Sequence, residues 1–170
     1  MSRSEQGLSN DRYMCIPRTL IFVTRKERVL LLKGAPTKRI WANLYNGVGG
    51  HVERGEDVLS SAVRELEEET GLRVDLRLVG TLQVDVEPMR GICVYIFAGE
   101  SDAGEPRPSV EGELAWIPFD ALEKYPLVGD VRILLARIRT MDVASPPFSA
   151  RSFYDENDRL QVRFSDDMKG

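Results

Sequence analysis

Residues 50–72, GHVERGEDVLSSAVRELEEETGL, decide the fold of this chain. The stretch begins at a glycine turn, carries two acids where a helix would start, and ends at Gly71, a residue suited to the left-handed position that terminates many helices. At about 100° per residue, one arc of this helix carries small and aliphatic side chains: Leu59, Ala62, Val63, Leu66 and Thr70. The arc taken as opposite carries the charged side chains: Arg64, Glu65, Glu68 and Glu69. The pattern predicts an amphipathic helix with a buried aliphatic face and an acidic face.

The three glutamates of this helix indicate more than a solvated surface. Glu65 repels Glu68 and Glu69 at the i,i+3 and i,i+4 spacings, which costs a helix a few tenths of a kcal/mol per pair. A purely structural helix would be better served by lysines there. Crowded carboxylates beside a glycine loop instead provide the hard oxygen ligands that Mg²⁺ prefers. We therefore interpret this face as a magnesium platform, with ordinary solvation as the alternative.

The same stretch resembles the signature of the Nudix hydrolases at every defined position. The matching residues, in order, are Gly50, Glu56, Arg64, Glu65, Leu66, Glu68, Glu69, Gly71 and Leu72. The resemblance implies a hydrolase of nucleoside diphosphates linked to another group, working with Mg²⁺ or Mn²⁺. It also implies an α/β fold, an α/β/α sandwich in which the signature helix packs on a central mixed sheet.

The resemblance also implies roles for individual residues. Glu68 and Glu69 are the stronger metal-ligand candidates, Glu65 is either a ligand or the base that takes a proton from water, and the carbonyl of Gly50 is a further ligand candidate. Arg64 orients the carboxylates through charge-assisted hydrogen bonds. The predicted catalytic residues are accordingly Glu65, Arg64 and Glu68.

Three acids remain outside this set. Glu56 is expected to stabilise the loop and the helix start, with a water-mediated metal contact as the alternative. Relatives also supply an acid from beyond the signature, and Glu111 or Glu113 is the natural candidate here. The alternative for both is a rim carboxylate without a role.

The composition of the chain excludes several classes of function. The net charge of −4 argues against binding of nucleic-acid polymers through a basic surface. No apolar run approaches the length of a membrane span, and the N-terminus lacks the apolar core of a signal peptide. Two cysteines are too few for a disulfide framework, with Cys93 expected to be a buried apolar residue, and the single histidine, His51, excludes a multi-histidine zinc site. A cytoplasmic protein is expected.

Hydrophobic periodicity predicts one domain over residues 14–165, preceded by a mobile polar segment, 1–13. The strand-like segments are residues 19–24 and 28–33, which are expected to form a hairpin, then 76–87, 91–98 and 113–117, and a C-terminal hairpin of 148–155 and 160–165. The continuous apolar run 91–98 predicts a central strand buried on both faces. A second helix is expected over 130–141, and polar loops over 34–50 and 99–112.

The residues just before the signature helix, 46–50, indicate which substrate the protein binds. Asn46-Gly47-Val48-Gly49-Gly50 is similar to the corresponding stretch of the oxidised-purine nucleoside triphosphatases, the 8-oxo-dGTP-cleaving subgroup of the family. An asparagine amide can read a purine edge because it both donates and accepts, although Asn-Gly is also a common turn. Asp130 is either a base contact or a helix N-cap.

Basic residues near the 34–50 loop, Lys33 and Arg39, are candidate phosphate contacts; ordinary surface positions are the alternative. Three functions stay open: a pyrophosphohydrolase of purine or oxidised-purine nucleoside triphosphates, a hydrolase of another derivative such as ADP-ribose or a sugar nucleotide, and a non-catalytic nucleotide sensor. The intact glutamates favour the first two. The expected partner is a small nucleotide, bound by a monomer or a homodimer.

Overall fold

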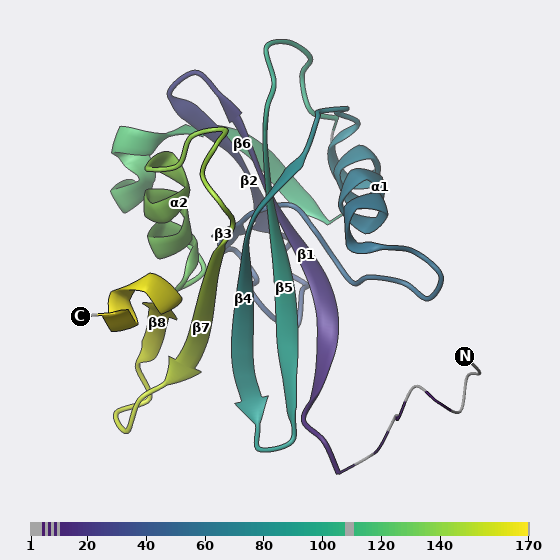
Figure 1. Ribbon diagram of the computed structural model, residues 1–170. Coiled ribbons are helices and arrows are strands. Elements are labelled where there is room, and N and C mark those ends of the chain that lie inside the picture. Colours follow the sequence, from purple (N-terminus) through teal and green to yellow (C-terminus); the bar gives the residue numbers. More distant parts are fainter. Residues whose placement is uncertain (1–4, 6, 8, 10, 108–110, 170) are drawn as a thin grey trace.

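A computed structural model describes residues 5, 7, 9, 11–107 and 111–169 of the chain. Its centre is a mixed eight-stranded sheet in the order β3-β2-β1-β5-β4-β7-β8, with β6 paired to β2 (Figure 1). The strands are β1 Met14–Arg25, β2 Arg28–Gly34, β3 Tyr45–Asn46, β4 Arg77–Glu87, β5 Arg90–Glu100, β6 Gly112–Pro118, β7 Phe148–Tyr154 and β8 Leu160–Phe164. The helices are α1 Val58–Thr70, α2 Val131–Arg139 and the short 3₁₀ turns η2 Phe119–Lys124 and η3 Ser165–Lys169.

The two α-helices cover opposite faces of the sheet, which confirms the predicted α/β/α sandwich (Figure 1). Strand alternation divides the core between them. In β1, Phe22 packs in the cluster that contains the buried face of α2, whereas Ile21 and Val23 pack in the cluster that contains the buried face of α1. We call these two sides of the sheet the α2 face and the α1 face.

The predicted hairpins are present. β1 and β2 pair antiparallel, and so do β7 and β8 at the C-terminal end. Among the pairings that were not predicted, two are parallel: β1 runs parallel to β5, and β7 runs parallel to β4. Gly80 of β4 permits the second pairing, because a Cβ at this position would collide with the ring of Phe148.

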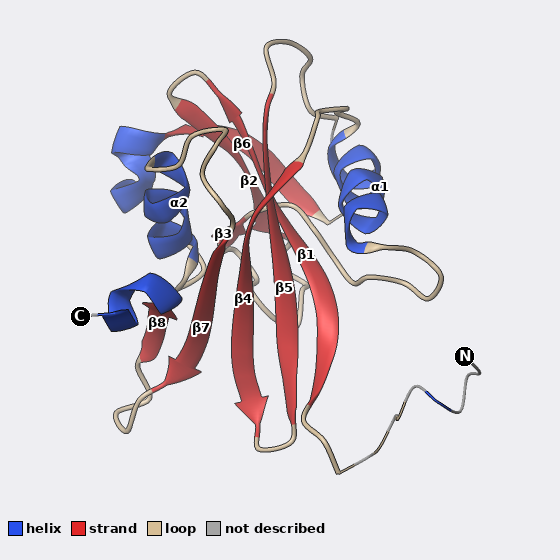
Figure 2. Ribbon diagram, viewed as in Figure 1, coloured by secondary structure: helices blue, strands red, loops and turns tan. Residues whose placement is uncertain are grey.

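The prediction that residues 91–98 are buried on both faces is only partly right. β5 does lie centrally, between β1 and β4, but only its upper half has fully covered side chains, with Ile96 facing α2 and Phe97 facing α1. Cys93, expected to be buried, is half-buried. The reason is visible in Figure 2, where the lower parts of β1, β4 and β5 extend past both helices.

The structure describes the N-terminal segment and the loop between β5 and β6 only in part. The predicted mobile segment 1–13 lies largely outside the described residues, but Tyr13 has a defined partner, since its hydroxyl accepts a hydrogen bond from the amide of Gln83 at 3.2 Å. The polar loop after β5 is described only up to residue 107 and from residue 111. In the described part of the chain, no helix is long and apolar enough to cross a membrane.

Candidate metal and nucleotide site

The ends of α1 are fixed by its own sequence. Asp57 is the N-cap, and its carboxylate accepts hydrogen bonds from the backbone N–H groups of Leu59 and Ser60 at 2.9 and 3.0 Å. At the other end Gly71 adopts the left-handed conformation, φ 70°, and its N–H bonds to the carbonyl of Glu67 at 2.8 Å. Both predicted helix boundaries are confirmed.

The orientation of α1 about its axis differs from the prediction. Ala62, Leu66 and Thr70 are buried as expected, but Leu59 and Val63 are 45% and 44% exposed. Ser61, which the pattern left out, is fully buried. The buried arc is therefore rotated toward Ser61, which leaves Val63 outside it; Leu59 falls within the arc in projection but is exposed in the first turn of the helix.

This rotation turns two of the glutamates inward, so they do not lie opposite the core as predicted. In projection Glu65 and Glu69 fall between Ser61 and Ala62, both of which are buried. The side chain of Glu65 is only 14% exposed. Glu68, by contrast, is 62% exposed.

A glycine turn receives the two inward carboxylates. The backbone N–H of Gly49 donates to the carboxylate of Glu69 at 3.2 Å, and a Cβ at Gly50 would collide with the carboxylate of Glu65. Gly49 has φ +144°, and a Cβ there would meet the carbonyl of Thr19 on β1. Gly49 therefore requires glycine, whereas a side chain at Gly50 would displace the Glu65 carboxylate. The Gly50 carbonyl, a predicted metal ligand, accepts from the Thr19 N–H at 2.9 Å and retains its second lone pair.

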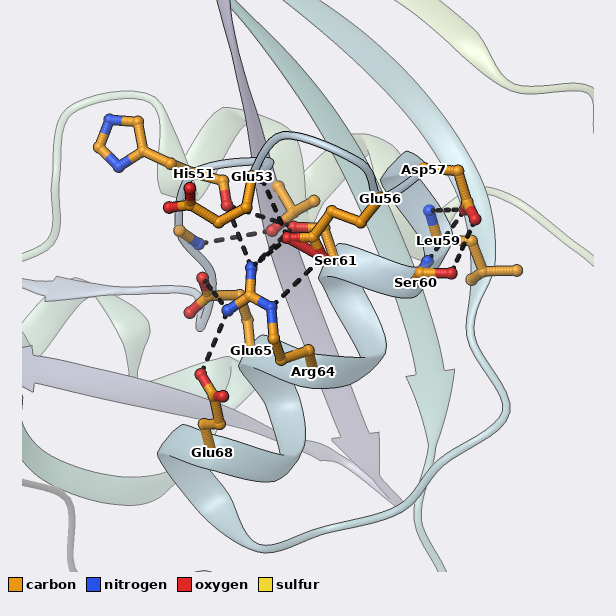
Figure 3. A network of polar contacts seen from close by, with 12 residues as sticks. His51, Glu53, Glu56, Asp57, Leu59, Ser60, Ser61, Arg64, Glu65 and Glu68 are labelled. Carbon is orange, nitrogen blue, oxygen red and sulfur yellow. Dashed lines mark hydrogen bonds and ion pairs between the residues drawn. The ribbon is translucent and has the colours of Figure 1, made fainter.

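Arg64 ties the cluster together (Figure 3). Its guanidinium contacts Glu56 at 2.7 Å, Glu65 at 2.9 Å and Glu68 at 3.2 Å, and it also donates to the carbonyl of His51 at 3.2 Å. These carboxylates raise the pKa of Arg64, first through the hydrogen bond to Glu56, and the same bond lowers the pKa of Glu56. Arg64 thus contacts all three carboxylates, and its role in positioning them for catalysis stays a prediction. Glu56 is held by Arg64 and by the Glu53 N–H, so it acts in the loop.

Glu69 is the carboxylate whose titration is most strongly altered. Desolvation raises its pKa to about 7, with Glu65 and Glu111 adding repulsion, while the Gly49 hydrogen bond and Lys38 oppose the shift. A group of this kind stays partly protonated at neutral pH unless a cation compensates its charge.

The structure separates the two acids predicted beyond the signature. Glu111 forms an ion pair with Lys38 at 2.6 Å, and both lie close enough to Glu69 to influence its pKa. Glu113 pairs with Lys33 across β6 and β2, and its charge acts on Tyr45. Glu113 alternates with Leu114 in β6 and therefore lies on the α2 face with Ala115 and Ile117, whereas Glu111 precedes the strand and lies near Glu69. Lys38 is one of the basic residues near the start of the 34–50 loop for which the sequence suggested a phosphate contact, with an ordinary surface position as the alternative.

The four predicted substrate contacts have different surroundings. The side-chain oxygen of Asn46 accepts from the N–H of Gly47 at 2.8 Å, so the turn engages half of its amide. Asp130 precedes α2 but makes no capping hydrogen bond, and burial raises its pKa. The Lys33 ammonium lies 5.9 Å from the ring of Tyr45, and Arg39 is exposed in the loop after β2.

The donor chemistry of this cluster fits a hard divalent cation. Carboxylate and carbonyl oxygens are the ligands that Mg²⁺ prefers, and the Gly50 position leaves room for the Glu65 carboxylate against the backbone. Within the described ranges, no group of three or more His, Cys, Asp or Glu side chains is arranged to hold a metal ion. Arg64 accounts for this, since it occupies the space between Glu65 and Glu68, with the latter turned outward.

Comparisons with known proteins agree with the geometry. The model of the NUDIX domain family matches residues 16–138. The oxidized purine nucleoside triphosphate hydrolase of Danio rerio is 36% identical over 106 residues, covering 61% of this chain and 67% of the relative, and that of Mus musculus is 37% identical with the same coverage. The solved structure of a mutator MutT protein from Bacillus halodurans superposes with a TM-score of 0.73 over 89% of this chain and 98% of the other, at 22% identity.

An α/β/α sandwich with an acidic helix against a glycine turn defines a class of metal-assisted phosphoanhydride hydrolases. The chain belongs to the NUDIX domain family. It is a Nudix hydrolase.

Proposed function

We propose that this protein hydrolyses purine nucleoside triphosphates, oxidised purines included, to a nucleoside monophosphate and pyrophosphate in a Mg²⁺-dependent reaction. The observation that carries the proposal is the pair of inward carboxylates, Glu65 and Glu69, held against the Gly49 and Gly50 turn. The names of the zebrafish and mouse relatives, both oxidized purine nucleoside triphosphate hydrolases, support the substrate class.

The acidic cluster is the proposed metal site. Glu65, Glu68 and Glu69 would hold the ion together with the Gly50 carbonyl, and Mn²⁺ suits the same oxygen ligands. A metal bound there neutralises charge on phosphoryl oxygens and orients water for attack. Rotation of the Glu68 side chain, which is exposed and joined to Arg64 at 3.2 Å, would bring its carboxylate inward. Glu111 is the proposed additional acid.

Side chains of the protein would hold Glu65 in place, accept a proton from water and contact the phosphates. Arg64 keeps Glu65 in place from one side, while Gly50 allows it to approach the backbone from the other. Glu65 serves either as a ligand or as the acceptor of the proton from the attacking water. Lys38, paired with Glu111 beside the cluster, is placed to meet a phosphate.

For the substrate, Asn46 retains its NH₂ group for a base even though the turn engages its oxygen. Asp130 is a partly buried carboxylate without a capping bond, which suits a second base contact. Lys33 and Arg39 remain proposed phosphate contacts. We further propose that residues 14–165 form one domain and that the protein works in the cytoplasm on small nucleotides.

The test is a substrate screen with purified protein in the presence of Mg²⁺. We expect 8-oxo-dGTP and dGTP to be cleaved faster than a pyrimidine triphosphate, ADP-ribose or a sugar nucleotide, with pyrophosphate as a product. EDTA should abolish turnover, and Glu68→Gln should reduce it strongly. Full turnover in EDTA would refute the metal site; release of a product other than pyrophosphate would favour a different nucleotide derivative.

A further inference from the structure

A basic residue on β1 is not used by the cluster described above. Arg18 immediately precedes Thr19, whose backbone N–H and hydroxyl bond to Gly50 at 2.9 and 3.4 Å. Arg18 itself is bridged to His51, the residue after Gly50. It therefore lies beside the turn that receives the glutamates.

The side chain of Arg18 points away from those glutamates. Thr19 and Ile21 share one side of β1, which is the α1 face, so Arg18 and Leu20 lie on the α2 face. In the parallel pairing of β1 with β5, Arg18 lies opposite Val94, which also packs against the cluster of the α2 face. Arg18 is thus a half-buried cation beside aliphatic side chains.

The hydrogen bonds of Arg18 leave one end of the guanidinium available. Its Nε donates to Nε2 of His51 at 3.2 Å, so this nitrogen of the imidazole acts as an acceptor. Figure 3 shows the His51 ring pointing away from the carboxylates that surround Arg64. Among the described residues, the Arg18 guanidinium has no carboxylate partner, and its two Nη groups donate to no protein atom. Burial without a counter-charge also lowers the pKa of Arg18.

An end-on guanidinium fork beside an apolar surface suits a planar group that presents oxygen and nitrogen acceptors. Guanine offers O6 and N7 in this way, and arginine binds them bidentately, whereas adenine presents an amino donor in place of O6. A triphosphate is a poorer fit, because it would have to leave the metal-binding face and contact aliphatic side chains.

We propose that Arg18 is a base-reading residue that selects guanine, which presents the O6 and N7 acceptors together, over adenine. This inference rests on the proposed triphosphate hydrolysis and deepens it. His51 orients the guanidinium through Nε, and the Nη groups donate to the base. The proposed metal-binding glutamates and Arg18 then hold opposite ends of one nucleotide, on the two faces of the sheet beside the glycine turn.

The test compares dGTP with dATP in wild type, Arg18→Gln, Arg18→Lys and a control, Arg28→Gln. Arg28 is exposed at the start of β2 and has no assigned role. We expect Arg18→Gln to lower kcat/KM for dGTP by roughly 5- to 150-fold, the range for one bidentate arginine–guanine contact. The loss should fall mainly on KM, while dATP should change less than about threefold. Arg18→Lys should not restore the preference, since an ammonium lacks the fork.

Several results would overturn the inference. An equal loss for both nucleotides that lysine rescues would assign Arg18 to the phosphates, and no loss for either would leave it without a substrate role. If the wild type cleaves neither nucleotide, this result contradicts the proposed hydrolysis and not the base-reading role of Arg18. Calorimetric binding of dGMP and dAMP then decides the base-reading role: Arg18-dependent preference for dGMP supports it, and equal binding rejects it. Melting curves of all variants exclude unfolding as the cause.

Discussion

At the scale of single residues, the carboxylates of the proposed metal site repel one another in the folded protein. Glu69 is the clearest case, because burial and the neighbouring Glu65 both disfavour its charged form. The folded state therefore binds a proton at Glu69 more tightly than the unfolded chain does. A carboxylate whose charged form is disfavoured in the metal-free protein fits the proposed role of Glu69 in cation binding.

The first prediction concerns this residue in metal-free protein. The folded pKa of about 7 exceeds the ordinary value of 4.5, so the favourable contribution of protonated Glu69 is present below pH 4.5 and is lost as pH rises through 7. Glu69→Gln should remove this part of the pH dependence, worth up to about 3 kcal/mol, and make the protein more stable than wild type at pH 8. Urea unfolding in EDTA at pH 5 and pH 8 measures it.

The matched control is Glu67→Gln on the same helix, an exposed acid paired with Arg73. It should leave the pH dependence unchanged. A Glu69→Gln protein that is less stable than wild type at pH 8 would contradict the assigned desolvation. The same variant should have strongly reduced activity, because it removes a formal charge from the metal site.

The second prediction concerns Arg64, whose guanidinium contacts three carboxylates. Arg64→Lys keeps the charge but loses the fork, so it cannot orient Glu56, Glu65 and Glu68 together. We expect kcat to fall by at least about tenfold, the effect of losing roughly 1.4 kcal/mol in the transition state, with a higher Mg²⁺ requirement and a smaller change in nucleotide KM. Steady-state kinetics against Mg²⁺ concentration test this. A change confined to nucleotide KM would instead make Arg64 a substrate contact.

At the scale of elements, α1 is held by one row of side chains and not by the whole aliphatic arc. Leu66 is 1% exposed and packs in the cluster of the α1 face, while Leu59 is 45% exposed. Leu59 falls between Leu66 and Thr70 in projection but lies in the first turn of α1, whereas Glu65 and Glu69 reach the glycine turn because the buried arc extends to Ser61. Helix packing and metal-site geometry are therefore one constraint.

The third prediction follows from this packing. Leu66→Ala should lower the free energy of unfolding by about 2–5 kcal/mol, the usual range for truncating a buried leucine. Leu59→Ala, the same change on an exposed position of the same helix, should cost less than about 1 kcal/mol. Denaturant unfolding of both variants provides the measurement. Equal losses would mean that α1 packs through a different face.

At the scale of the whole molecule, the C-terminal hairpin belongs to the core although it follows the residues that match the family model, 16–138. Strand β7 extends the sheet beside β4, and Phe148 fits against Gly80. Phe148 and Ala150 are buried in the cluster of the α2 face, with Phe164 packed on it. The hairpin thus completes one side of the sandwich.

The fourth prediction is that a chain ending at residue 147 does not fold cooperatively. Removing the hairpin exposes the edge of β4 and the side of the core that contains Leu134 and Leu135. Near-ultraviolet circular dichroism and thermal melting compare it with the full chain, which serves as the control. A truncated protein that melts at the same temperature would show that the hairpin is dispensable.

Local sequence was sufficient for much of this structure. The caps of α1, the hairpins β1–β2 and β7–β8 and the helix α2 all follow from short-range patterns, because hydrogen bonds between residues close in the chain decide them. The glutamates of the site were likewise visible as a spaced signature. Exposure of Leu59 and Val63 was not, since a projection has no information about where the neighbouring strand lies.

The sequence by itself therefore determined the element types, the α/β class and the identity of the acidic site. Only the tertiary structure decided the rotation of α1, the parallel pairings of β5 and β7, the separation of Glu111 from Glu113, and the place of Arg18 beside the glycine turn. The physical reason is the range of the interactions involved. Periodicity and capping act within a few residues, whereas side-chain burial and the approach of charges depend on segments far apart in the chain.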